Sequence, residues 1–94
     1  MNVAVTVRVV GDLRRYVQAD SLELDAAPCT LGGAVEELVG RNPRLEEQLF
    51  DQQGRLHHAT VLAINGRPVG WPQDREIVIA DGGELMLTRF HSGG

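Results

Sequence analysis

The chain has 94 residues, 43% of them hydrophobic, and a formal net charge of −4 from 9 arginines and 13 acidic residues. A chain of this length predicts one small domain with a single core. The acidic balance, without a run of basic residues, excludes the electrostatic footprint of a nucleic-acid-binding protein. The absence of lysine excludes a phosphate-binding P-loop and a Schiff-base enzyme, because both need a lysine side chain.

The cysteine content and the amino-terminal segment indicate a compartment. A single cysteine, Cys29, cannot form an internal disulfide, which favours a reducing environment. Residues 1–10 contain Arg8 within an apolar run and lack a basic start, so they are not typical of a signal peptide. No apolar stretch reaches the length of a membrane span. We therefore expect a cytoplasmic chain that does not bind membranes.

Two strands are predicted in the first quarter of the chain. Residues 3–10 alternate, with Val3, Val5, Val7 and Val9 on one face. A period of two with β-branched residues is typical of a half-buried strand. Gly11-Asp12 interrupts the pattern, and a polar connection follows. Residues 21–25 alternate again, so the two strands are expected to form a hairpin with a long loop.

A helix and a second, shorter helix are predicted next. Thr30 is a favourable N-cap because its hydroxyl can accept a hydrogen bond from an early backbone N–H. Apolar residues then recur at helical spacing from Leu31 to Val39, and Gly40 is predicted to end this helix. Asn42 followed by Pro43 marks the start of the shorter helix.

The second half of the chain predicts three further strands. Residues 59–64 form a strong apolar strand that ends at Asn65-Gly66, a dipeptide favoured in hairpin turns. Residues 67–69 would return as a short edge strand, where proline is tolerated. Residues 81–83 predict another turn, and residues 84–90 predict the last strand.

The sequence ends on two adjacent glycines, Gly93 and Gly94. Glycine contributes no side chain to packing and loses the most conformational freedom on ordering. The pair therefore indicates either a frayed terminus or a carboxyl end that is itself the working part. Five extended residues, 90–94, span at most about 17 Å, and a backbone without Cβ atoms can enter a narrow channel.

Taken together, these motifs resemble the ThiS/MoaD family of ubiquitin-like sulfur carriers. The resemblance is carried by the first strand, the TLGGAVEELVG helix, the VLAINGRPV hairpin, the ADGGEL turn and the terminal Gly-Gly. It implies an α+β, β-grasp fold: a mixed sheet of four to five strands with one main helix packed on one face. The first and last strands would be its central parallel pair. Residues 1–90 would form the domain, and residues 91–94 a flexible tail.

The same resemblance implies a function for the carboxyl end. An E1-like adenylating enzyme of the MoeB/ThiF type would adenylate the Gly94 carboxylate, with Gly93 beside it, and a sulfur source would convert it to a thiocarboxylate. The sulfur would pass to a downstream biosynthetic enzyme. The chain would act as a carrier and not as an enzyme, bind no cofactor, depend on MgATP held by its partner, and be a monomer when free.

Partner enzymes are expected to contact the tail and the sheet face opposite the helix. The residues assigned to partner binding are Val10, Met86, Thr88, Phe90, His91 and Ser92. Phe90 is equally compatible with sealing the end of the sheet. The longer segment 41–58 favours a carrier for cysteine or another thio-metabolite over the thiamine type.

Other interpretations remain open at this point. The chain could be the small subunit of a MoaD-type molybdopterin synthase, a ubiquitin-like protein modifier, or a subunit whose tail only anchors it. The absence of lysine excludes lysine-linked chains of the protein itself. A metal site at His57 and His58 is not expected, since neighbours on a strand point to opposite faces. Cys29 is expected to be inert, and Trp71 to cover the core.

Overall fold

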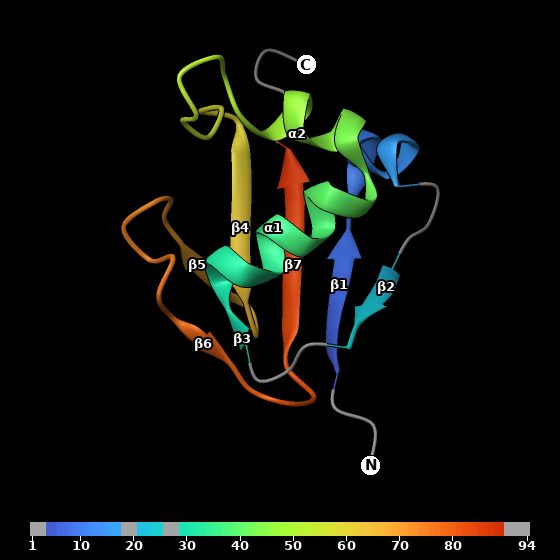
Figure 1. The fold of residues 1–94 in the computed structure, drawn as a ribbon, viewed down its shortest axis with the longest axis vertical. Coiled ribbons are helices and arrows are strands. Elements are labelled where there is room, and N and C mark those ends of the chain that lie inside the picture. The colour runs from blue at the N-terminus through green and yellow to red at the C-terminus, as the bar shows by residue number, and fades with distance from the viewer. Residues whose placement is uncertain (1–3, 18–20, 26–28, 90–94) are drawn as a thin grey trace.

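The structure, a computed structural model, describes residues 4–17, 21–25 and 29–89. Five strands form one mixed sheet in the order β2-β1-β7-β4-β5, and helix α1 crosses one of its faces (Figure 1). The strands of this sheet are β1 Val5–Val9, β2 Ser21–Leu24, β4 Thr60–Ile64, β5 Arg67–Val69 and β7 Glu84–Arg89. The predicted α+β, β-grasp arrangement is confirmed.

Five further elements complete the described fold. The helices are α1 Leu31–Arg41, α2 Pro43–Leu49 and the 3-10 helix η1 Gly11–Tyr16; β3 Cys29–Thr30 and β6 Val78–Ile79 form a separate two-stranded sheet. The expected polar connection after β1 is therefore a 3-10 helix, which buries Leu13 completely. Nothing in the sequence pattern predicted the pairing of β3 with β6.

The first and last strands lie at the centre of the sheet, as predicted. β1 pairs with β7 in parallel, with Val7 opposite Leu85 and Val9 opposite Leu87. β2 and β4 flank this pair, each antiparallel to its neighbour. Because β7 lies between β1 and β4, pairing with both strands fixes the direction of β7.

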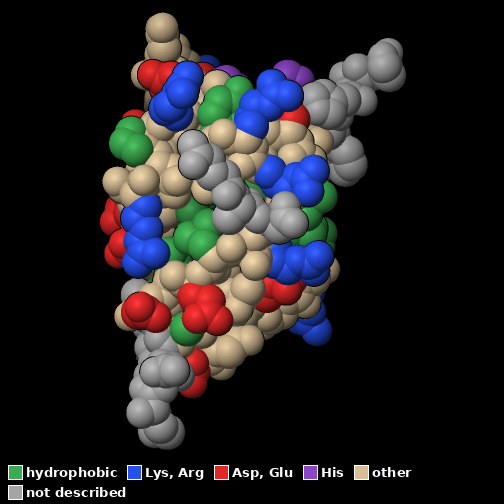
Figure 2. Space-filling view, turned by 90° about the vertical axis from the view of Figure 1, so that its right-hand side faces the viewer, with side chains coloured by type: hydrophobic (Ala, Val, Ile, Leu, Met, Phe, Trp, Pro, Cys, Tyr) green, Lys and Arg blue, Asp and Glu red, His purple; other side chains and the backbone are tan. Residues whose placement is uncertain are grey.

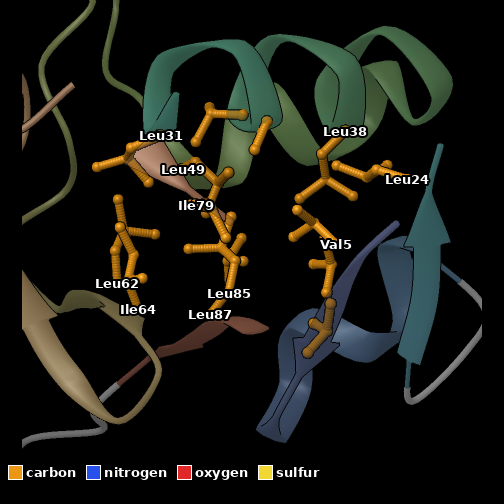
Figure 3. Packing of buried hydrophobic residues seen from close by; sticks show 14 of the residues in the cluster. Val5, Leu24, Leu31, Leu38, Leu49, Leu62, Ile64, Ile79, Leu85 and Leu87 are labelled. Carbon is orange, nitrogen blue, oxygen red and sulfur yellow. The ribbon is translucent and has the colours of Figure 1, made fainter. Parts of the chain in front are cut away.

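The hydrophobic core lies between the sheet and α1. Inward side chains of the central strands, among them Val5, Leu85 and Leu87, face Leu31 and Leu38 of the helix (Figure 3). All five are fully buried. Burial of each such side chain stabilises the folded state by about 1.5–3 kcal/mol relative to exposure. The period-two and helical patterns of the sequence therefore identify the core.

The two ends of α1 differ in how well the sequence predicts them. Thr30 caps the helix as expected, since its Oγ1 accepts a hydrogen bond from Gly33 N at 3.0 Å. The prediction that Gly40 ends the helix is wrong: α1 continues to Arg41, and Asn42 is its C-cap. Asn42 donates from its backbone and its side-chain Nδ2 to Leu38 O, at 3.1 and 3.0 Å. These bonds satisfy a terminal carbonyl without a glycine.

The two turns that carry the family resemblance fasten one end of the sheet. Asn65 and Gly66 both have positive φ, 51° and 84°, as a type I′ hairpin turn requires. Asn65 Oδ1 accepts a hydrogen bond from Glu84 N at 2.9 Å, and Asp81 Oδ1 accepts one from Ala4 N at 2.9 Å. Both turns lie where β7 begins, at the opposite end of the strand from Arg89.

Candidate functional site

The candidate site is the point where β7 ends and the predicted tail begins. β7 ends at Arg89, which is opposite Thr60 at the start of β4. Phe90 and the predicted tail, residues 91–94, lie outside the described residues, as does the expected boundary between domain and tail. The described structure therefore shows how the end of β7, before the predicted tail, is held.

Arg89 holds the end of β7 against two other elements. Its Nη1 lies 3.5 Å from Asp12 Oδ2 of η1. Its Nη2 donates to the carbonyl oxygen and to Oε1 of Gln48 on α2, at 3.1 and 3.0 Å. The Arg89 side chain is only 20% exposed. The guanidinium thus connects three elements at the last described residue of β7.

We predict that Arg89→Ala destabilises the fold by about 1–3 kcal/mol, because half-buried polar groups of Asp12 and Gln48 lose a charged partner. Urea unfolding followed by circular dichroism measures this loss. Arg67→Ala is the matched control, because Arg67 is exposed on the edge strand β5 and should change stability by less than about 0.5 kcal/mol. Equal, small effects of both substitutions would contradict this role of Arg89.

The sheet face opposite α1 carries the other residues assigned to partner binding. Met86 lies between Arg8 of β1 and Ala63 of β4, and Thr88 lies opposite Val61. Met86 and Thr88 are half-buried, while Val10 is 39% exposed. The structure therefore brings these three residues to one face, as the alternation predicted. Val10 also lines a hollow of about 390 Å³, together with Arg8 and Arg14.

Charges on the surface are mixed in sign. Arg8 Nη1 lies 3.8 Å from Glu84 Oε2 on the sheet face opposite α1. Figure 2 looks onto the side of the molecule where β2 lies and shows acidic and basic side chains interspersed there. A phosphate backbone needs a continuous basic surface, which this side does not offer among its described residues. Within the described ranges, no helix is long and apolar enough to cross a membrane.

Other candidate groups of the sequence show no chemistry in the described part of the chain. Burial raises the pKa of the Cys29 thiol, which disfavours the reactive thiolate. No three His, Cys, Asp or Glu side chains of residues 4–17, 21–25 and 29–89 gather as metal ligands. Trp71 is half-buried and packs against the core cluster, as predicted.

Comparison with known proteins identifies the family. The model of the ThiS family matches residues 7–94, which include the tail. The chain belongs to the ThiS family. Membership places this ThiS-family chain among the ubiquitin-like sulfur carriers and modifiers, as the sequence motifs predicted. The search of curated proteins gives no match.

Solved structures similar to this ThiS-family chain share its fold over almost its whole length. The crystal structure of SAMP1 from Haloferax volcanii is 27% identical, with a TM-score of 0.83, and the match covers 97% of this chain and 99% of that one. CysO from Mycobacterium tuberculosis, described as an antigen, is 26% identical with a TM-score of 0.75, and 93% and 99% are covered. The BexX/CysO complex from Amycolatopsis orientalis is 24% identical with a TM-score of 0.77, covering 97% and 100%, and shows the fold alone.

Sequence reasoning found the strand that leads to the tail but missed what holds its end. Arg89 carries no motif, and its partners Asp12 and Gln48 lie 77 and 41 residues away in the sequence. A signal was nevertheless present: an arginine next to the tail, at an inward position of a strand that otherwise buries leucine. Such an arginine needs polar partners when it is half-buried.

Proposed function

We propose that this chain is a sulfur carrier whose Gly94 carboxylate becomes a thiocarboxylate. The observation that carries the proposal is the terminal Gly-Gly pair, which follows the central strand of a ThiS-family chain after only a few residues. The hydrogen bonds of Arg89 support it, because they fix the end of β7 while the glycines add no side chain to the end of the tail.

The chemistry needs an activated carboxyl group, because a free carboxylate is anionic at neutral pH and a poor electrophile. An E1-like enzyme of the MoeB/ThiF type supplies MgATP, and the Gly94 carboxylate displaces pyrophosphate to form an acyl adenylate. Hydrosulfide then attacks the Gly94 carbonyl: a C–S bond forms, the C–O bond to the phosphate breaks, and AMP leaves. If an enzyme persulfide attacks instead, a thiol must afterwards reduce the S–S bond.

In this proposal the chain is a substrate of its partners and not an enzyme. Its contact with them is the tail together with the face that carries Val10, Met86 and Thr88. A downstream enzyme of cysteine or thio-metabolite synthesis receives the sulfur; likeness to CysO, at 26% identity, favours this branch over a MoaD-type subunit. The lone cysteine and the need for ATP favour the cytoplasm as the place of action.

The test is the intact mass of the chain after incubation with a MoeB/ThiF-type enzyme, MgATP and sulfide. We expect a gain equal to the replacement of one oxygen by one sulfur. The same chain without Gly94 should show no gain. An unchanged mass, while the partner consumes ATP in the presence of the chain, would overturn the proposal.

A second function, protein modification, is favoured by the 27% identity to SAMP1, a small archaeal modifier protein. The same acyl adenylate would then be transferred to a lysine of another protein. Because this chain has no lysine, it cannot be its own acceptor through a lysine side chain. Incubation of the complete reaction with cell extract, followed by trypsin digestion and detection of a Phe-His-Ser-Gly-Gly remnant on lysines, distinguishes modification from sulfur transfer.

A further inference from the structure

A hollow of about 810 Å³ lies beside α2, on segments that the proposed function does not use. Its walls are α2, the loop that follows it and Trp71 after β5; the lining residues used below are Glu46, Glu47, Phe50, Asp51, His57 and Trp71. Most of them belong to the segment 41–58. The long segment 41–58 therefore forms most of the wall of this hollow.

One side of the hollow is aromatic and fixed in place. The rings of Phe50 and Trp71 lie 5.5 Å apart, tilted by 52°, and both side chains pack against the buried core. A guanidinium already lies near this wall: the Arg75 Cζ is 5.9 Å from the centre of the Trp71 ring. Indole faces attract cations, and most strongly the planar guanidinium of arginine.

The other side of the hollow is acidic. Glu46 and Glu47 are exposed, and neither forms an ion pair within the described residues. Asp51 is held in place, since its carboxylate accepts hydrogen bonds from Arg55 N and Gln53 N. The hydrogen bond from Arg55 N has the largest effect, and together these bonds lower the pKa of Asp51, so that its carboxyl group stays ionised.

Cations near the hollow compensate only part of this charge. Arg55 Nε lies 3.4 Å from Asp51 Oδ2, and Arg75 lies 3.9 Å from Glu36 on α1. His57 Nε2 lies 3.4 Å from the carbonyl oxygen of Glu47 and not from its carboxylate. The carboxylates of Glu46 and Glu47 thus remain uncompensated beside an aromatic wall.

The hollow is also close to the start of the tail. Glu47 lines it, and the next residue, Gln48, forms the two hydrogen bonds with Arg89. Consecutive Cα atoms are about 3.8 Å apart, so one turn of α2 carries both the wall of the hollow and the contact that holds the end of β7. The hollow therefore lies near the end of β7, before the predicted tail.

We propose that the hollow binds an arginine side chain of the adenylating enzyme that takes up the tail. The guanidinium lies against the Phe50–Trp71 wall and pairs with Glu46 and Glu47. A planar guanidinium satisfies both requirements, because it stacks on an aromatic face and donates two hydrogen bonds to a carboxylate. Only the identity of the partner rests on the proposed function; the chemistry of the site rests on the contacts above.

The first test uses the free chain with Nα-acetyl-arginine methylamide as the probe, followed by ¹H–¹⁵N chemical shifts. We expect saturable shifts at Glu46, Glu47, Asp51 and the Trp71 indole, with a dissociation constant on the order of 1–10 mM. The citrulline analogue, which has nearly the same shape without the charge, should bind at least about threefold more weakly. Equal binding of the two probes, or no saturable shift, would overturn the proposal.

The second test measures binding of the full chain to the adenylating enzyme by calorimetry, without ATP. The double substitution Glu46→Gln and Glu47→Gln should raise the dissociation constant at least about threefold. The matched control, Glu23→Gln with Asp25→Asn, removes the same charge at the β2 edge, across the sheet from β5, and should leave it unchanged.

An unchanged dissociation constant in the double variant would overturn the proposal. Failure of the sulfur-carrier function is seen separately, as a missing gain of mass while binding to the enzyme is intact.

Discussion

A chain extended by one alanine after Gly94 is expected to form thiocarboxylate at least about 100-fold more slowly than the original chain. The extension moves the terminal carboxylate by one residue, about 3.3–3.6 Å along an extended backbone, and places a Cβ where the sequence ends in glycine. A displacement of about 1 Å at a reacting group already costs on the order of 100-fold in rate. The time course of the intact mass, with enzyme, MgATP and sulfide, measures the effect.

The control for this prediction is the same alanine placed before Met1. That chain has the same composition and an unaltered carboxyl end, so its rate should equal that of the original. Calorimetric binding to the adenylating enzyme shows in addition that the extended chain is folded and recognised. If the extended chain forms thiocarboxylate at the original rate, the reaction does not require the carboxyl group at the position of Gly94, and the prediction is wrong.

Leu87→Ala is expected to destabilise the fold by about 2–5 kcal/mol. Leu87 is fully buried in the central strand, between Val9 of β1 and Leu62 of β4, so truncation leaves a cavity under α1. A domain is typically stable by about 5–15 kcal/mol, and this loss is therefore a large part of the total. The midpoint of urea unfolding gives the measurement, on the assumption of a single cooperative transition.

Thr88→Ala is the matched control for the core substitution. Thr88 is the next residue of β7 but lies half-buried on the opposite face of the sheet, so its truncation should cost less than about 1 kcal/mol. Thiocarboxylate formation by this variant reports separately on the proposed contact face. Losses of stability that are similar for the two variants would contradict the division of the sheet into a core face and an open face.

The architecture could be predicted from the sequence because its local signals agree with the final fold. Alternating valines in residues 3–10 and leucines in residues 84–90 identify two half-buried strands, and Asn65-Gly66 fixes the hairpin between β4 and β5. The parallel pairing of β1 with β7 did not come from periodicity, which carries no information on partners. It came from the resemblance of motif order and spacing to a known family.

The parts that were missed depend on contacts between distant segments. The prediction for Gly40 was wrong because Asn42 supplies the hydrogen bonds that end α1. The pairing of Cys29 with Ile79 and the contact of Arg89 with Gln48 join residues 50 and 41 positions apart, for which no local pattern exists. The hollow beside α2 likewise depends on the contact between Trp71 and Phe50, which are brought together only when the chain folds.

The parallel pairing of β1 with β7 also sets an order of events during protein synthesis. Thr6 lies opposite Glu84 in this pair, so its formation closes a loop that contains most of the chain. β1 can pair early with β2 but cannot pair with β7 until β7 has left the ribosome, and long-range closure of this kind slows folding. A nascent chain that stops before β7 lacks the middle of the sheet and is exposed to proteases. The topology thus couples availability of the carboxyl tail to completion of the domain, so in the proposed function a partner enzyme meets the tail only on a finished domain.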